Sequence, residues 1–149
     1  MKRMIGVMLA VAAADGGSKW LAARLLGDRC VSLGWLMELR ITHNTGMALG
    51  IFQENRLAAL LLPAAVIVCG WLLLRRYRAT GFTQVAYGLI LGGFLGNFGE
   101  RLLRGAVLDM IYFPFLPWFV CNVADIAISA GVAMLAASLL LRPGDWQER

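Results

Sequence analysis

Charged residues divide this sequence into long apolar stretches. Residues 57–74, 79–99 and 126–141 contain no charged side chain, and residues 4–26 are apolar apart from scattered polar interruptions. A helix that spans a bilayer needs roughly 20 mostly apolar residues. The pattern therefore predicts one membrane-embedded domain, residues 1–149, of the all-α integral membrane class, with four transmembrane helices at about residues 4–26, 57–74, 81–103 and 119–141.

Two connecting segments differ from the helices in composition. Residues 27–56 mix β-branched and aromatic residues with glycine and asparagine, which favours a small, partly sheet-like element resting on the membrane surface. Residues 105–118 contain Pro114 and Pro117, which exclude a regular helix there. Trp118 and its aromatic neighbours are typical of the interface between membrane and water.

The distribution of positive charges predicts the orientation. Seven lysine and arginine residues fall on the side that holds both termini and residues 75–78, and five fall on the other side, together with most of the acids. Loops rich in Lys and Arg stay in the cytoplasm. Both termini are therefore expected in the cytoplasm, and the net charge of +5 needs no nucleic acid partner.

Composition excludes several classes of protein. The chain is 60% hydrophobic and 15% charged, which argues against an ordinary soluble domain and against disorder. It contains one histidine, His43, and three scattered cysteines without a CxxC motif. Such a set cannot convincingly form a structural zinc site or a disulfide framework, so no metal and no cofactor are expected.

Polar residues inside predicted spans need a reason, since burying a charge in a bilayer is costly. Asp15 and Lys19 are four residues apart and can pair on one helical face. Gly93, Asn97 and Arg101 share the same spacing and form a polar stripe. A second stripe, at Gly88, Gly92 and Gly96, is typical of close helix packing.

Two acids are predicted near the outer edge of the membrane. Asn122 and Asp125 share one face near the start of the fourth span, and Asp109 lies in the connection before it. Two carboxylates that share a site titrate in a coupled way, so one can be an anion while the other keeps its proton. Aspartic proteases use such a pair, but proton handling and a purely structural role remain open at this point.

Five motifs resemble, in order, those of lipoprotein signal peptidase, also called signal peptidase II. Residues 92–102, with the sequence GGFLGNFGERL, resemble the family's GGxxGNxxDR motif, and residues 107–109 resemble its VxD element. Residues 122–128, NVADIAI, are similar to NxADxxI, and Gly131 follows as expected. Residues 15–19 and 44–48 are similar to the family's DxxSK and NTGxA motifs.

This resemblance implies a four-helix aspartic endopeptidase of the bacterial inner membrane with a small extracytoplasmic β-cradle. Such an enzyme cuts prolipoproteins just before a diacylglyceryl-modified cysteine, with its active site near the outer face. Its implied partners are the lipidated prolipoprotein, membrane lipid and globomycin-type inhibitors. The carry-over makes Asp109 and Asp125 the catalytic pair. Substrate-binding or supporting roles fall to Asn44, Asn97, Arg101, Asn122, Asp15, Lys19 and Gly93.

The sequence departs from the family pattern at three places. Glu100 stands where the family usually has Asp, Cys121 where Phe is common, and Leu49 where Phe is common. Two alternative functions remain: a small proton-linked transporter subunit that uses Asp15, Lys19 and Asp125 as a relay, and an inactive scaffold relative. The transporter predicts that Asp109 is dispensable.

Overall fold

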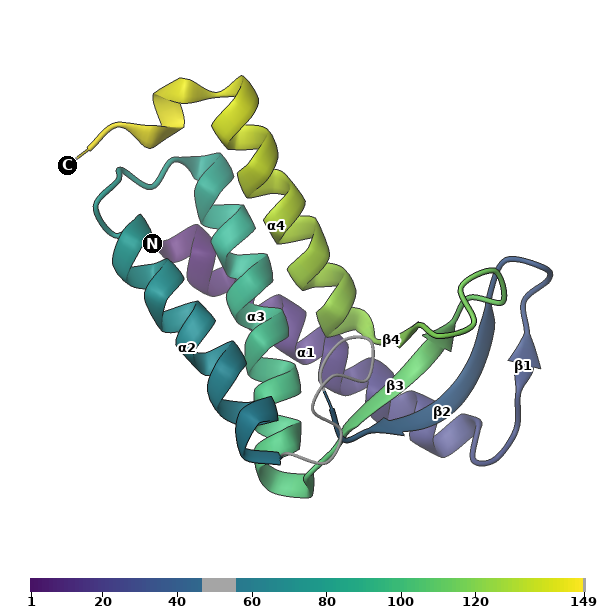
Figure 1. Ribbon diagram of the computed structural model, residues 1–149. Helices are drawn as coiled ribbons and strands as arrows, with labels where there is room; N and C mark the ends of the chain where they lie inside the picture. Colours follow the sequence, from purple (N-terminus) through teal and green to yellow (C-terminus); the bar gives the residue numbers. More distant parts are fainter. Residues whose placement is uncertain (47–55, 149) are drawn as a thin grey trace.

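The computed structural model describes residues 1–46 and 56–148, which form a helical bundle with a small sheet at one end (Figure 1). The elements, in chain order, are α1 (Lys2–Leu25), β1 (Val31–Ser32), β2 (Glu38–Asn44), α2 (Arg56–Leu74), α3 (Gly81–Arg104), β3 (Val107–Tyr112), β4 (Val120–Cys121), α4 (Val123–Leu141) and the short 3-10 helix η2 (Pro143–Trp146).

Helix α3 is the centre of the bundle, because α1 and α4 both pack along it and α2 contacts it more lightly. The glycine stripe allows the approach of α1. A Cβ atom on Gly88 would lie 2.7 Å from the Cβ of Val7, and one on Gly92 would lie 2.7 Å from the carbonyl oxygen of Met8. No side chain fits in either place, so the predicted packing face is confirmed.

The four strands form one antiparallel sheet in the order β1-β2-β3-β4, which projects from the end of the bundle (Figure 1). Glu38 pairs with Tyr112, but further along β2 the register shifts by one residue, so that Thr42 pairs with Asp109. An extra residue of this kind is a β-bulge, which bends the strand and redirects its side chains. The bulge therefore sets which β2 residues face Asp109.

Two predictions about the outer segments need correction. The fourth helix begins at Val123 and not at residue 119, because Val120 and Cys121 form a strand and Asn122 caps the helix. The sheet also extends beyond residues 27–56, since β3 and β4 contribute half of its strands. The predicted sheet-like element within residues 27–46 is confirmed, and residues 47–55 lie outside the described part of the chain.

Hydropathy alone supports fewer spans than the charge pattern. In the described part of the chain, only Val123–Leu141 is long and apolar enough to cross a membrane, and the apolar stretch Leu57–Leu72 is shorter. The four helices are therefore confirmed as helices, and their crossing of a membrane stays a prediction.

The burial pattern is inverted relative to a soluble protein. Large apolar side chains such as Leu9, Trp20 and Leu139 are more than half exposed on the outside of the helices. Asp15 and Lys19 lie in the interior. Water disfavours this arrangement and a hydrocarbon solvent favours it.

The end of the bundle opposite the sheet holds both ends of the described chain (Figure 1). The N-terminal ammonium donates to Oε1 of Gln84 at 2.7 Å, at the start of α3. Near the C-terminus, Arg142 and Ser138 both donate to Oδ2 of Asp145. Tyr77, in the α2–α3 connection, pairs with Glu148. The site described next is therefore remote from both termini.

Candidate active site

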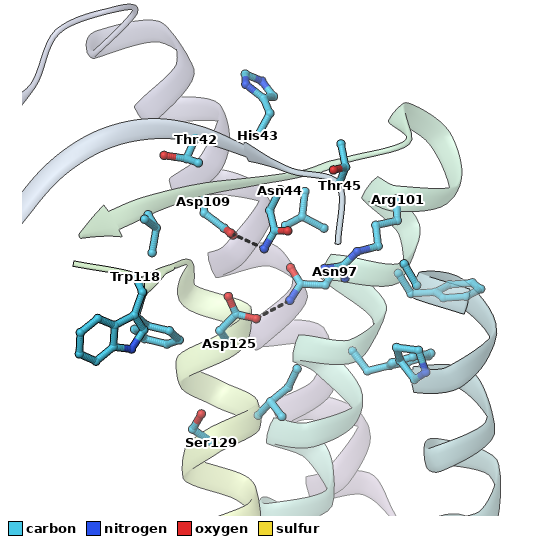
Figure 2. Close-up of a pocket in the computed structure, with 18 residues that line it drawn as sticks. Thr42, His43, Asn44, Thr45, Asn97, Arg101, Asp109, Trp118, Asp125 and Ser129 are labelled. Atoms are coloured by element: carbon cyan, nitrogen blue, oxygen red, sulfur yellow. Dashed lines mark hydrogen bonds between the residues drawn. The ribbon is translucent and has the colours of Figure 1, made fainter. Parts of the chain in front are cut away.

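A cavity of about 570 Å³ opens where the sheet meets the bundle. Four elements contribute acid, amide and guanidinium groups to its lining: Asn44 from β2, Asn97 and Arg101 from α3, Asp109 from β3, and Asp125 from α4. Figure 2 shows Asp109 above Asp125, with the side chains of Asn44 and Asn97 beside them and one asparagine hydrogen-bonded to each acid. The fold thus brings together residues that lie far apart in the sequence.

Asp109 is buried in β3, with 2% of its surface exposed. Both of its carboxylate oxygens accept hydrogen bonds from side-chain amides: Oδ2 from Nδ2 of Asn44 at 3.0 Å, and Oδ1 from Nδ2 of Asn122 at 2.6 Å. Thr42 pairs with Asp109 across the strands, so Asn44, two residues further along β2, is its diagonal neighbour on the same face. The bulged register therefore provides the Asn44 contact.

Asp125 is held by the start of α4. Asn122 is the N-cap, and its Oδ1 accepts from the backbone N–H of Asp125 at 2.9 Å. The Asp125 carboxylate completes the capping box, because its Oδ2 accepts from the backbone N–H of Asn122 at 3.2 Å. Its other oxygen, Oδ1, accepts from Nδ2 of Asn97 at 2.7 Å (Figure 2). A helix cap thus fixes the second carboxylate.

Asn122 joins the two carboxylates. Its Nδ2 donates to Asp109 and also to Oδ1 of Asn97, at 3.1 Å, while Asn97 donates to Asp125. The side chain of Asn122 is fully buried, and both of its polar atoms have partners. One amide therefore sets the relative position of both acids.

The surroundings of Asp109 disfavour its charge. The pKa of Asp109 is raised from 3.8 to about 6, mainly by burial and also by the nearby Asp125. Hydrogen bonds from Asn44 and Asn122, and the charge of Lys19, act in the opposite direction. In the described part of the chain no ion pair reaches either acid, so a proton can be kept on one of them near neutral pH.

A buried ion cluster supports Asn97 from the far side. Nζ of Lys19 lies 2.8 Å from Oδ2 of Asp15 and 3.0 Å from Oε2 of Glu100, and it donates to Oδ1 of Asn97 at 3.0 Å. Because a cation occupies its oxygen, the Asn97 amide must point its nitrogen at Asp125. The predicted Asp15–Lys19 pair is confirmed, and it reaches the site through Asn97.

Arg101 and Gly93 support the site in different ways. Nη2 of Arg101 donates to the carbonyl oxygen of Gly46 at 2.6 Å, so it holds the end of β2 that carries Asn44. A Cβ on Gly93 would collide with the carbonyl oxygen of Ala124 and lie 2.8 Å from Cγ1 of Ile128. Gly93 therefore acts by letting α4 approach α3, although the sequence placed it in a polar stripe.

Sequence reasoning missed part of the Glu100 environment. Glu100 and Arg104, four residues apart on α3, form an ion pair at 3.4 Å, but Glu100 also contacts Lys19 and accepts from the backbone N–H of Leu108 at 3.2 Å. The spacing of three residues between Asn97 and Glu100 was the signal that both lie on one helical face. Residues 47–49, which include part of the NTGxA motif and Leu49, lie outside the described residues.

The arrangement suits acid–base chemistry on a substrate in the cavity. Two carboxylates share a hydrogen-bonded network, and at least one of them has a pKa close to neutrality. Such a pair can take a proton from water with one member and give a proton with the other. Among the described residues no group of three or more His, Cys, Asp and Glu side chains is placed to hold a metal ion.

Solved structures share the fold of this chain. Two structures of a bacterial membrane enzyme, determined by the in meso method at 2.3 Å and 1.9 Å resolution, share this fold with TM-scores of 0.84 and 0.81. Each is 22% identical in sequence, and they cover 100% and 95% of this chain and 94% and 95% of their own. The helical bundle with its four-stranded sheet is thus the fold of a bacterial membrane enzyme.

Sequence comparisons give the family. The family model described as Signal peptidase (SPase) II matches residues 7–141. A lipoprotein signal peptidase of Shouchella clausii is 33% identical over 91% of both chains, and one of Bacillus subtilis is 32% identical over 93% of both. This chain belongs to the signal peptidase II family of proteases, as its motifs predicted.

Proposed function

We propose that this protein is a lipoprotein signal peptidase that works as an aspartic endopeptidase. It removes the signal peptide from a diacylglyceryl-modified prolipoprotein by cutting just before the lipidated cysteine. The observation that carries the proposal is that Asp109 and Asp125 line one cavity and are linked through the side chains of Asn122 and Asn97, in a chain of the signal peptidase II family.

The two carboxylates divide the chemistry between them. The ionised acid takes a proton from a water molecule, whose oxygen attacks the carbonyl carbon of the scissile peptide bond. The protonated acid gives its proton to the developing oxyanion. In the second step the acid that took the water proton gives it to the amide nitrogen, and the other acid takes back a proton from a hydroxyl of the tetrahedral intermediate as the C–N bond breaks and the amine of the lipidated cysteine leaves. Both acids then regain their starting state.

The cavity offers a place for both the polar and the apolar parts of such a substrate. Beside the aspartates it is lined by Phe94, Phe98 and Trp118, and by Pro63 from α2. Trp118 is 68% exposed, so it is available to a substrate or to lipid. Contacts along a signal helix and its lipid hold the scissile bond at the acids, which lowers the entropic cost of attack.

The proposed membrane arrangement has four spans, both termini in the cytoplasm and the active site near the outer face. Two observations support it. The termini and the arginines of residues 75–78 lie at one end of the bundle, and the aspartates lie at the other (Figure 1). Asp15 and Lys19 lower the hydropathy of α1, but they neutralise each other inside the bundle.

Cleavage by single variants tests the pair. Purified wild type, Asp109→Asn and Asp125→Asn are each given diacylglyceryl-modified prolipoprotein, and loss of the signal peptide is followed as a shift on a gel. Both variants should lose turnover by about a thousandfold or more, because each lacks one proton-transferring group. A globomycin-type cyclic peptide should block the wild type.

Asp28→Asn is the matched control, because Asp28 is an exposed acid at the same end of the molecule. It should cleave at the rate of the wild type. Thermal unfolding in detergent checks that all variants are folded. Near-normal turnover by either folded dyad variant would refute the aspartic mechanism, and it would favour the transporter alternative if Asp109 were the dispensable residue.

A further inference from the structure

Glu100 contacts neither aspartate and does not line the cavity, yet it is almost enclosed. Its side chain is 12% exposed and lies on α3, one turn after Asn97. Its Oε1 contacts the exposed side chain of Arg104 at 3.4 Å, while Oε2 faces inward to Lys19 and to the backbone N–H of Leu108. The inward oxygen is therefore the one that reaches the surroundings of the site.

The hydrogen bond from the Leu108 N–H to Glu100 takes the place of a bond to a neighbouring strand. β2 covers one edge of β3 along its length, but in the described part of the chain β4 covers the other edge at Ile111 and Tyr112 alone. The N–H of Leu108, at the uncovered part of that edge, donates to Glu100 instead. An uncovered strand edge presents unpaired backbone groups, and Glu100 supplies the partner for this one. Asp109 is the next residue, so its position depends on this bond.

The contact with Lys19 leads to the second acid. Nζ of Lys19 lies 3.0 Å from Oε2 of Glu100 and 2.8 Å from Oδ2 of Asp15, and it also donates a hydrogen bond to Oδ1 of Asn97. Asn97 then donates to Asp125. Without Glu100, one of the two anions that aim the ammonium is lost, and the orientation of the Asn97 amide is less firmly set.

We propose that Glu100 is a positioning residue whose single inward oxygen holds both halves of the catalytic pair. It fixes Asp109 through the Leu108 amide, and it fixes Asp125 through Lys19 and Asn97. This role rests on the proposed function, since it presumes that the two acids act together. Glu100 itself touches no reacting atom.

Three variants test the proposal. Glu100→Ala removes both inward contacts, Glu100→Asp keeps a carboxylate one methylene shorter, and Arg104→Gln removes only the outward contact of Glu100. Amide hydrogen exchange on the peptide that covers residues 107–112 reads the bond to Leu108. Cleavage of lipidated prolipoprotein gives kcat and KM, with the concentration of competent enzyme counted by titration with globomycin.

Glu100→Ala should speed exchange at the Leu108 amide by about tenfold or more, and it should lower kcat per competent enzyme by a similar factor. KM should stay within about twofold, because Glu100 does not line the cavity. Glu100→Asp should recover most of the rate, and Arg104→Gln should match the wild type. If Glu100→Ala does not fold, Glu100→Gln, which keeps the shape but not the charge, should show smaller changes in the same direction.

Unchanged exchange at Leu108 or unchanged kcat in a folded Glu100→Ala protein would overturn the proposal. A loss of kcat in Arg104→Gln equal to that in Glu100→Ala would overturn it as well. The proposed function fails by a different result. If wild type did not cleave lipidated prolipoprotein at all, the function would be wrong, while the exchange measurement would still decide whether Glu100 holds the strand.

Discussion

Replacing Asn122 with serine separates its two tasks. The Asn122 oxygen caps α4 by accepting from the N–H of Asp125, and its nitrogen donates to Asp109 and Asn97. A serine hydroxyl is among the preferred N-caps, so Asn122→Ser keeps the cap. It is too short to offer the amide donor. The variant therefore removes the link between the carboxylates while the helix still begins at the same residue.

The structure sets the size of the effect. A hydrogen bond to a carboxylate contributes about 1.5–3 kcal/mol, and at 2.6 Å the bond from Asn122 to the buried Asp109 is a short one. That bond favours the ionised acid, so its loss raises the pKa of Asp109 further above 6. About 1.5 kcal/mol corresponds to about one pH unit. The limb of the kcat-against-pH profile that depends on Asp109 should move to higher pH by about that amount. The value of kcat should fall by about tenfold to a hundredfold.

The assay is a pH profile of kcat with lipidated prolipoprotein, together with thermal unfolding of each variant. Asn122→Ala provides the comparison, because it loses the cap as well and should be about 1 kcal/mol less stable than Asn122→Ser. The reasoning is refuted if Asn122→Ser keeps both the rate and the pH profile of the wild type. It is equally refuted if the serine and alanine variants have the same stability.

Two further predictions concern packing and pH. Gly93→Ala should destabilise the protein by roughly 1–3 kcal/mol and slow cleavage, since its Cβ would press on the backbone of α4. Gly99→Ala, whose new Cβ would meet no described atom within 4 Å, should instead be neutral or stabilising by up to about 1 kcal/mol, and equal melting temperatures for Gly93→Ala and Gly99→Ala would contradict this account. Because the pKa of Asp109 rises on folding from 3.8 to about 6, its contribution to stability is present below about pH 4 and is lost as pH rises through 6. Unfolding titrations should show a loss of at most about 3 kcal/mol over that range, absent in Asp109→Asn.

Local patterns were sufficient for the helices, for their glycine packing face and for one buried ion pair, whereas the two candidate acids were singled out as a catalytic pair by the resemblance to the family motifs. Four apolar stretches bounded by charges predicted four helices, and the spacing of Asp15 and Lys19 predicted a pair that the structure contains at 2.8 Å. The glycine stripe predicted close packing in the same way. These features depend on residues three or four apart, whose relation along a helix is fixed by its geometry.

The strands were harder to predict, since their pairing is not local. β3 lies in residues 105–118, where two prolines indicated only the absence of a regular helix, and β4 occupies the first residues of the expected fourth span. Val107–Tyr112 forms a strand because β2, more than sixty residues earlier, pairs with it. The register that gives Asp109 its contact with Asn44 depends on a bulge that no local pattern marks.

The sequence by itself determined the helical segments, the motifs of the family and the identity of both acids. Only the tertiary structure decided how these acids are held: that Asn122 bonds to Asp109 while it caps the helix of Asp125, and that Glu100 reaches the strand beside Asp109. The reason is physical. Helix formation and charge spacing act between near neighbours, whereas a buried polar side chain must find its partners among whatever segments the fold brings to it.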